Sequence, residues 1–300
     1  MSSTIAFLGI GLMGKPMTEN LINAGFNLRL WNRTVAKAEY FSGRAAICNT
    51  PQEAVTGAEF VITMLENGPI VDEILVGLNI FGHLTPGTLV IDMSSIPPTT
   101  ARQHAAQARN ARAGYLDAPV SGGTIGAEQA SLSIMAGGAP EDFARAAPIF
   151  AALGRATHIG PAGSGQLAKL ANQAIVGITI GAVAEALLLA AKGGANPVAV
   201  REALMGGFAS SRILELHGQR MLERHFEPGA TARVQHKDLR MILDEATGSG
   251  LRLPLAEKVF EEYEAMLATG LENVDHSGLL LYLEALNQTQ LNHNLPTQQN

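Results

Sequence analysis

Short apolar runs alternate with amphipathic stretches through the first half of the chain, a pattern that predicts strands alternating with helices. The predicted strands cover residues 4–8, 27–31, 45–48, 60–65, 88–93, 115–118, 132–136 and 156–159. The helices predicted between them cover 15–24, 35–42, a segment that starts at Pro51, 70–75, 99–112 and 140–153. This alternation indicates an α/β fold with a doubly wound parallel sheet, which binds ligands at the carboxyl ends of its strands.

The second half of the chain shows helical spacing only. Its longest predicted helix runs from Gly163 to Gly194, shortly before Pro197. Further helices are predicted at 197–205, 212–223, 237–247, 254–269 and 276–287. We therefore expect two domains, an α/β domain at 1–162 and an all-α domain at 163–300 that begins with the long interdomain helix. The polar residues 288–300 are expected to form a frayed tail.

The composition supports two folded domains and argues against several kinds of partner. Hydrophobic residues make up 47% of the 300 residues and charged residues 16%, which is enough apolar surface for real cores. The net charge is −6 and neither half is basic, so we expect no nucleic acid and no anionic membrane as a partner. Cys48 is the single cysteine, which suits a reducing cytoplasm.

Two segments share some features with membrane sequences. The amino-terminal residues are apolar, but they lack a basic region and contain several glycines, unlike a signal peptide. The long helix could span a bilayer by length, but Glu185 would cost about 2.5–3.5 kcal/mol near the bilayer centre. We therefore expect protein to cover this helix on most sides.

The sequence G-I-G-L-M-G at residues 9–14 lies between a predicted strand and a predicted helix, as a Rossmann-type dinucleotide-binding loop does. Gly9 permits the tight turn, Gly11 lets a pyrophosphate approach the backbone, and Gly14 lets the helix pack on the strand. The amino end of the helix offers N–H groups to the phosphates. We assign this loop, including Leu12 and Met13, to cofactor binding.

Asn32, Arg33 and Thr34 follow the second predicted strand, where an NAD site places an acidic residue against the ribose 2′-hydroxyl. This position holds no carboxylate that would repel a 2′-phosphate, and Arg33 can pair with one by charge-assisted hydrogen bonds. The sequence therefore favours NADP(H), with NAD(H) as the alternative. The alternative is that Arg33 is simply a solvated residue at a strand end and binds no phosphate.

Met64, Leu65 and Ser95 end two further predicted strands. At that edge of a parallel sheet they can line the adenosine and the nicotinamide ribose, although ordinary strand-end residues would look the same.

Ser121, Gly122 and Gly123 follow the strand predicted at 115–118. The serine hydroxyl and the glycine N–H groups can form a concave site for a carboxylate. A plain turn is the competing interpretation.

Lys169 is the only formally charged residue between Arg155 and Glu185. An isolated ammonium in an apolar helix needs solvation, because buried charge is costly. Asn172 lies three residues further on, so both side chains project from one helix face. The residue is therefore either a catalytic lysine on a rigid helix or a core-helix lysine that reaches water.

Four sequence motifs together resemble the β-hydroxyacid dehydrogenase family: FLGIGLMGKPM at 7–17, DAPVSGG at 117–123, GQLAKLANQ at 165–173 and KDL at 237–239. They occur in the family's order, and the resemblance covers residues 4–287. The resemblance implies a Rossmann-type domain followed by a helical domain. It also implies hydride transfer between a nicotinamide cofactor and a small carboxylate substrate.

The resemblance further implies a role for single residues. Lys169 would be the catalytic acid and base, and Asn172 would touch the substrate. Lys237 would reach the cofactor from the helical domain, and Phe208 would line the substrate pocket. The family pattern also places the pyrophosphate at Gly9, Gly11 and Gly14, the nicotinamide ribose near Ser95, and the substrate carboxylate at Ser121, Gly122 and Gly123.

Several functions remain open at this level. Residues 205–221 are most similar to family members that reduce a small semialdehyde acid, while branches acting on 3-hydroxyisobutyrate, glyoxylate or succinic semialdehyde are alternatives. A non-catalytic dinucleotide-binding scaffold is the rival from another class, against which Lys169, Asn172 and Ser121 argue. The histidines lack metal-ligand spacing, so no metal is expected. The long apolar helix indicates a homodimer or homotetramer.

Overall fold

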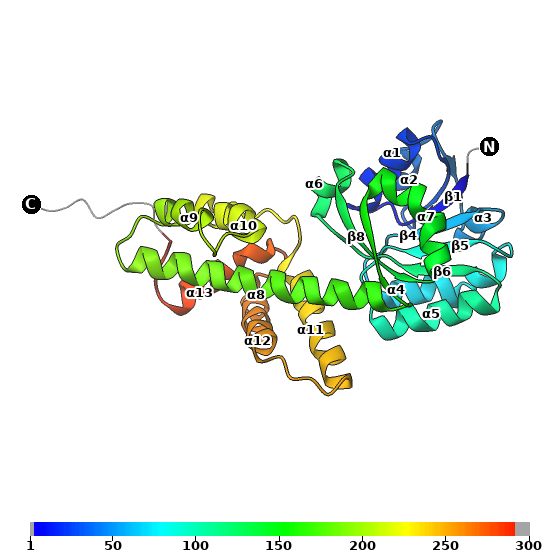
Figure 1. The fold of residues 1–300 in the computed structure, drawn as a ribbon. Coiled ribbons are helices and arrows are strands. Elements are labelled where there is room, and N and C mark those ends of the chain that lie inside the picture. The colour runs from blue at the N-terminus through cyan, green and yellow to red at the C-terminus, as the bar shows by residue number, and fades with distance from the viewer. Residues whose placement is uncertain (1–2, 292–300) are drawn as a thin grey trace, which may run out of the picture. The chain divides into compact units, whose positions relative to one another are not determined.

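The computed structural model describes residues 3–291, and the chain divides into two units, Met1–Lys169 and Leu170–Asn300. The first unit holds the sheet and the second is helical (Figure 1). The predicted domain boundary at residues 162 and 163 lies at the start of the long helix, whereas the division into units falls inside that helix. Most of the predicted tail, residues 292–300, lies outside the described residues.

The sheet of the first unit has the strand order β3-β2-β1-β4-β5-β6-β8-β7, with β9 also paired to β8. Its strands are β1 (Thr4–Leu8), β2 (Asn27–Trp31), β3 (Ala46–Ile47), β4 (Phe60–Thr63), β5 (Leu89–Asp92), β6 (Gly114–Asp117), β7 (Val120–Ser121), β8 (Leu132–Gly138) and β9 (Gly154–Gly160). All pairs from β3 to β6 are parallel, which confirms the predicted α/β class. The order reverses direction between β1 and β4, the kind of point at which doubly wound sheets bind ligands.

The sheet departs from the prediction beyond β6, because β8 runs antiparallel to both β6 and β7. A parallel neighbour would need a long crossover, usually a helix, to return the chain to the other end of the sheet. Between β6 and β8 the chain forms only β7 and the six-residue helix α6 (Gly123–Glu128), which the sequence did not predict. β9 then pairs parallel with β8.

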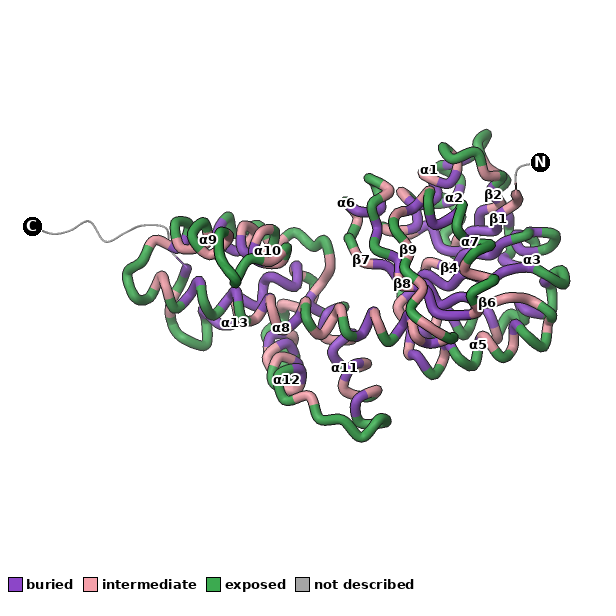
Figure 2. The backbone as a smooth tube through the Cα atoms, viewed as in Figure 1, coloured by how far each residue is buried: buried purple, intermediate pink, exposed green. Residues whose placement is uncertain are grey.

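Helices cover both faces of this sheet (Figure 1). They are α1 (Gly14–Asn23), α2 (Val35–Glu39), α3 (Pro51–Val55), α4 (Gly68–Asp72), a π-helical turn (Glu73–Gly77), a 3-10 turn (Ile80–His83), α5 (Pro98–Asn110), α6 and α7 (Pro140–Leu153). Alternate residues of β1 enter different cores: Phe7 belongs to the core that includes Met17 of α1, and Leu8 to the core that includes Ala101 of α5. Figure 2 shows the strands mostly buried and the surrounding loops mostly exposed.

The second unit consists of helices that share one hydrophobic core with α8 (Ser164–Lys192). The others are α9 (Pro197–Met205), α10 (Arg212–Glu223), α11 (Ala232–Gly248), α12 (Pro254–Ala268), a 3-10 turn (His276–Gly278) and α13 (Leu279–Leu286). The structure confirms the predicted bounds of α9 and α10. It begins α11 earlier than predicted, at Ala232, because the Thr231 hydroxyl accepts a hydrogen bond from Val234 N and caps the helix.

α8 is longer and more apolar than a typical core helix, and by length and composition alone it could cross a membrane. Only 39% of its most apolar stretch is buried, so the prediction that protein covers most of its sides is wrong for the single chain. The helical core uses one side of α8, through Ile180, Val183 and Leu187. Ile175 and Leu189 remain 67% and 76% exposed.

Candidate active site at the carboxyl edge of the sheet

The glycine loop between β1 and α1 has the backbone that a dinucleotide loop requires. Gly9 has a φ of 111°, and a Cβ on it would collide with the carbonyl oxygen of Met64. A Cβ on Gly14 would collide with the Gly9 carbonyl, so only glycine allows α1 to start this close to β1. Gly11 has open space around its missing side chain, which leaves its backbone approachable. The loop therefore fits a pyrophosphate at the amino end of α1.

Asn32, at the end of β2, holds this loop in place. Its side-chain oxygen accepts a hydrogen bond of 2.8 Å from Ile10 N, and its amide donates to Thr34 O. The sequence assigned Asn32 to the cofactor site without this bracing role. Arg33 and Thr34 are exposed beside it, where their side chains can meet a ligand.

The remaining predicted cofactor residues lie at neighbouring strand ends. Met64 and Leu65 follow β4 and are half-buried, and Ser95 follows β5 and is half-buried. Leu65 N donates a 2.9 Å hydrogen bond to the Ser94 hydroxyl, which ties the two strand ends together. In the glycine loop, Met13 is half-buried while Leu12 is 78% exposed, an apolar surface that a planar ring could cover.

The predicted carboxylate loop follows β6 and β7 at the same edge. Ser121 ends β7, and Gly122 and Gly123 lead into α6 with φ angles of 133° and 62°. A Cβ on Gly122 would lie 3.3 Å from Leu132 Cδ2, whereas a Cβ on Gly123 would meet no atom within 4 Å. The glycine pair is therefore both a structural turn and an open backbone surface.

Lys169 lies on α8, near its amino end, and is 9% exposed. The first turn of α8 is anchored to the sheet by Asp117, the last residue of β6. Asp117 Oδ1 accepts a hydrogen bond of 2.7 Å from Gly163 N, and its Oδ2 accepts one of 2.9 Å from Gln166 N. Burial raises the pKa of Asp117 to about 6, against the opposing effect of these two hydrogen bonds.

Asp117 and Gln166 are site residues that the sequence reasoning did not identify. Both stand inside motifs that it did notice, DAPVSGG and GQLAKLANQ. Their partners are 46 and 72 residues away along the chain, so no local pattern reports the contacts.

The helical unit holds the other predicted site residues in a polar cluster. The Asn172 amide donates to Gln173 Oε1 at 2.8 Å, and the Gln173 amide donates to Asp238 Oδ2 at 2.7 Å. Lys237 Nζ lies 3.1 Å from Asp238 Oδ1. Asp238 is buried, so Lys237 contacts a fixed carboxylate directly, and Asn172 is linked to the same carboxylate through Gln173. Phe208 lies between α9 and α10 and is fully exposed.

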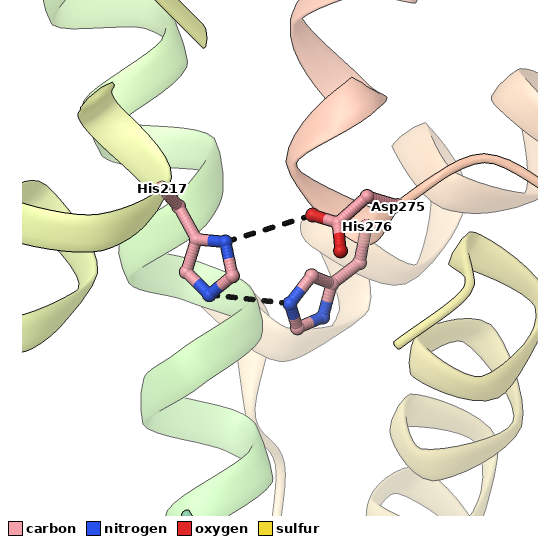
Figure 3. A group of neighbouring side chains, drawn as sticks. All are labelled: His217, Asp275 and His276. Atoms are coloured by element: carbon pink, nitrogen blue, oxygen red, sulfur yellow. Dashed lines mark hydrogen bonds and ion pairs between the residues drawn. The ribbon is translucent and has the colours of Figure 1, made fainter. Parts of the chain in front are cut away.

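His217, Asp275 and His276 form a second polar cluster in this unit (Figure 3). His217 Nε2 lies 3.3 Å from His276 Nε2, and His217 Nδ1 lies 3.6 Å from Asp275 Oδ1. Burial lowers the pKa of His276 to about 4, so its ring is neutral near pH 7 and can accept a hydrogen bond.

This cluster has metal-ligand residue types but is arranged as a hydrogen-bonded group. Arg220 Nη1 lies 2.8 Å from Asp275 Oδ2, and the Ser277 hydroxyl donates to Asp275 Oδ1 at 2.6 Å. Burial opposes the charge on Asp275, but the hydrogen bond from His217 and the donors around it hold the pKa of Asp275 well below its usual range. A cation would have to displace these donors and sit beside a guanidinium.

Comparison with known protein families matches both halves of the chain. The model of the NAD-binding domain of 6-phosphogluconate dehydrogenase matches residues 4–160. The model described as the NAD-binding domain of NADP-dependent 3-hydroxyisobutyrate dehydrogenase matches residues 163–283.

Individual relatives are similar over nearly their whole length. The chain is 42% identical to 2-hydroxy-3-oxopropionate reductase of Escherichia coli K12, over 94% of this chain and 97% of that protein. It is 32% identical to an NAD-dependent L-serine dehydrogenase of Pseudomonas aeruginosa, over 91% and 95% of the two chains. Among solved structures, the Mycobacterium tuberculosis 3-hydroxyisobutyrate dehydrogenase with L-serine superposes with a TM-score of 0.87 at 32% identity, covering 94% and 99% of the two chains.

Proposed function

Because the chain belongs to the 3-hydroxyisobutyrate dehydrogenase family of β-hydroxyacid dehydrogenases, we propose that it is an NADP(H)-linked reductase that converts tartronate semialdehyde to glycerate. That it is an oxidoreductase with a nicotinamide dinucleotide cofactor follows from the family itself. The substrate is proposed chiefly on the 42% identity to 2-hydroxy-3-oxopropionate reductase, the observation that carries this choice.

The residues of the carboxyl edge fit such a cofactor. Gly9 and Gly14 pack too closely against backbone carbonyls to carry a Cβ, Gly11 leaves open space, and α1 begins directly after this loop, so its N–H groups can meet the phosphates. When bound, the nicotinamide supplies a hydride to the carbonyl carbon of the substrate. Met64, Leu65 and Ser95 would line the adenosine and the nicotinamide ribose.

Lys169 carries the acid–base role in this proposal. As hydride arrives, negative charge develops on the carbonyl oxygen of the substrate. A positioned ammonium stabilises that charge and then donates the proton. α8 supports this role because it is a rigid element whose first turn is fixed to the sheet.

The substrate carboxylate is assigned to Ser121, Gly122 and Gly123. The open backbone at Gly123 supports the assignment, since an anion can approach N–H groups that no side chain covers. From the helical unit we assign Asn172 and Phe208 to the substrate and Lys237 to the cofactor. The contact of Lys237 with buried Asp238, and the link of Asn172 to it through Gln173, support their selection as preorganised polar groups.

NADP(H) is proposed over NAD(H) because Arg33 and Thr34 are exposed after β2 and no acidic residue occupies positions 32–34. An acidic residue there would bind the ribose 2′-hydroxyl of NAD and repel the 2′-phosphate of NADP. Arg33 instead offers a planar pair of donors to the phosphate.

L-Serine, a 3-hydroxy acid, is the second candidate substrate. The name of the Pseudomonas relative and the ligand of the mycobacterial structure favour it. Oxidation of L-serine and reduction of tartronate semialdehyde both act on carbon 3 of a three-carbon acid. The same carboxylate-binding and acid–base groups therefore suit either substrate.

A substrate panel tests the proposal. Initial rates of NADPH and NADH oxidation are measured with tartronate semialdehyde, glyoxylate, succinic semialdehyde and methylmalonate semialdehyde, and rates of NADP⁺ and NAD⁺ reduction with L-serine and 3-hydroxyisobutyrate. The proposal expects the highest kcat/KM for tartronate semialdehyde with NADPH. A higher kcat/KM for any other pair replaces the proposed substrate or cofactor, and no turnover with any pair would favour a binding scaffold.

A further inference from the structure

The amino end of α8 packs closely against the sheet at β6 and β8. Asp117 closes its first turn by accepting hydrogen bonds from Gly163 N and Gln166 N, at 2.7 and 2.9 Å. These are two of the backbone donors that a helix start leaves without an intrahelical partner. The carboxylate comes from β6 and not from the residue before the helix, so the cap also joins two elements.

Two glycines allow the helix to come this close. A Cβ on Gly165 would collide with the carbonyl oxygens of Asp117 and Met135. A Cβ on Gly137 would lie 2.7 Å from both Asp117 Oδ1 and Gly165 N. Distances below 3.0 Å do not occur for real Cβ atoms, so α8 touches β6 and β8 backbone to backbone.

Gln166 fixes the same turn to the end of β5. Its side-chain amide donates to Ser94 O at 2.8 Å, and its Oε1 accepts from Ile96 N at 3.2 Å. Gln166 is 1% exposed and stands three residues before Lys169, so the two side chains share a face of the helix. We call Asp117, Gly137, Gly165 and Gln166 the α8 socket.

The α8 socket lies beside three parts of the proposed site: the nicotinamide ribose position, the carboxylate loop and Lys169. Its Gln166 contacts flank Ser95, which the proposed function places near the nicotinamide ribose. Asp117 stands four residues before Ser121, at the start of the segment that ends in the carboxylate loop. Lys169 lies one turn beyond the socket on α8.

We propose that Asp117 is a positioning residue, which holds the first turn of α8 so that Lys169 is fixed relative to the carboxylate loop. This inference rests on the proposed role of Lys169. A displacement of about 1 Å of a catalytic group can cost about 100-fold in rate. Because the Asp117 cap fixes the position of α8 against the sheet, it controls the rate of turnover.

The electrostatics of Asp117 agree with a functional reason for keeping it. Its side chain is fully buried, and burial raises its pKa, which means that the charged carboxylate is disfavoured in the fold. Asp92 and Tyr115, from β5 and β6, interact electrostatically with Asp117, and neither carries a positive charge. Residues that cost stability are kept where function requires them.

A double-mutant cycle between Asp117 and Lys169 tests the inference. Asp117→Asn keeps the volume but places an amide donor against one of the two N–H groups. We expect kcat with NADPH and tartronate semialdehyde to fall by about 10- to 100-fold, with NADPH affinity within about twofold of wild type. In the Lys169→Ala background, the same change should alter kcat by less than about twofold, because Asp117 acts through Lys169.

Two results would overturn the inference: an Asp117→Asn enzyme with kcat within twofold of wild type, or losses that multiply in the double variant. A Lys169→Ala enzyme with wild-type kcat overturns the proposed function instead, so the two failures are distinguishable. Should Asp117→Asn fail to fold, Asp117→Ser replaces it in the same cycle, being smaller and still able to cap a helix.

Asp142→Asn is the matched control. Asp142 lies in the first turn of α7 against Gly114, the first residue of β6, and its carboxylate accepts from Arg145 at 3.1 Å. Asp117 stands at the last residue of the same strand. The control should lower the melting temperature and leave kcat unchanged. If it lowered kcat as Asp117→Asn does, the effect at Asp117 would be one of general stability.

Discussion

At the scale of single residues, the carboxyl edge of the sheet combines exposed groups that can meet a ligand with buried groups that hold them. Arg33 is exposed, and its neighbour Asn32 braces the glycine loop through Ile10 N. Lys169 is itself buried, and Asp117 and Gln166 fix the turn that precedes it. Substitutions of residues that meet a ligand and of residues that hold them should therefore have different effects.

Substitution of Arg33 tests the cofactor proposal. Arg33→Ala removes a charged hydrogen-bond donor, and such a bond contributes roughly 1.5–3 kcal/mol. We expect kcat/KM for NADPH to fall roughly 10- to 100-fold, with kcat/KM for NADH nearly unchanged, as measured by initial rates at saturating substrate. A wild-type enzyme that already uses NADH better than NADPH would contradict the assignment.

The raised pKa of Asp117 predicts a specific pH dependence of stability. Its pKa is 3.8 in a free chain and about 6 when folded, so protonation is favoured by folding. The stability that this group contributes is present below pH 4 and is lost as the pH rises through 6. The free-energy difference between wild type and Asp117→Asn should therefore shift against wild type by roughly 2 kcal/mol from pH 4 to 7.5.

Denaturant unfolding of both proteins across that pH range measures this shift. The charge of Asp92 raises the pKa of Asp117, so the difference reports the interacting pair of carboxylates and not Asp117 alone. A difference that stays constant between pH 4 and 7.5 would show that Asp117 titrates normally.

At the scale of elements, the turn from β7 into α6 would bind the substrate carboxylate mainly through backbone N–H groups. Gly122 at φ 133° and close to Leu132 cannot be replaced without strain. Gly123 at φ 62° lies in the left-handed region, which alanine enters at a cost of about 1–2 kcal/mol, and it has space for a methyl.

Gly123→Ala therefore tests the carboxylate loop without rebuilding it. If the N–H groups of this turn bind the substrate carboxylate, the methyl should raise KM for tartronate semialdehyde about tenfold or more. NADPH affinity, followed by fluorescence titration, should stay within twofold. Gly57→Ala is the matched control, since Gly57 also has positive φ and open surroundings but lies in a different turn. Equal loss of both affinities would make this segment a structural turn.

The sequence predicted those elements best whose signals are local. α9 and α10 start after Asn196 and Ser211, whose side chains cap them, and both were placed correctly. β8 was predicted as a strand at 132–136, but its antiparallel direction was missed, because strand direction depends on the connection and not on the residues of the strand. The glycine loop was likewise found from its own residues, whereas Asp117 was not, because its role lies in contacts with Gly163 and Gln166.

At the scale of the whole molecule, α8 exposes large apolar side chains to solvent in the single chain. Ile175 and Leu189 are 67% and 76% exposed on a helix with a mean hydropathy of 2.2 over its most apolar stretch. Exposed apolar surface of this kind marks interaction sites. We propose that a second copy of the chain covers it, in a homodimer or homotetramer.

Light scattering coupled to size exclusion tests this assembly. Wild type should elute as a dimer or tetramer, and a charge introduced by Ile175→Glu should shift it towards monomer, because the buried carboxylate would be unpaired. Leu255→Glu is the control, since Leu255 is 69% exposed on α12 rather than on α8. A monomeric wild type at micromolar concentration contradicts the assembly.

The most direct test of the central claim is the kcat of Lys169→Ala with NADPH and tartronate semialdehyde, measured beside NADPH affinity. Loss of general acid catalysis predicts a fall in kcat of about 10²–10⁴-fold, with NADPH binding within twofold of wild type. Lys169→Arg should be almost as inactive, because a guanidinium keeps the charge but does not release a proton near neutral pH. A Lys169→Ala enzyme with wild-type kcat would contradict the account and leave Lys169 as a core-helix lysine that reaches water.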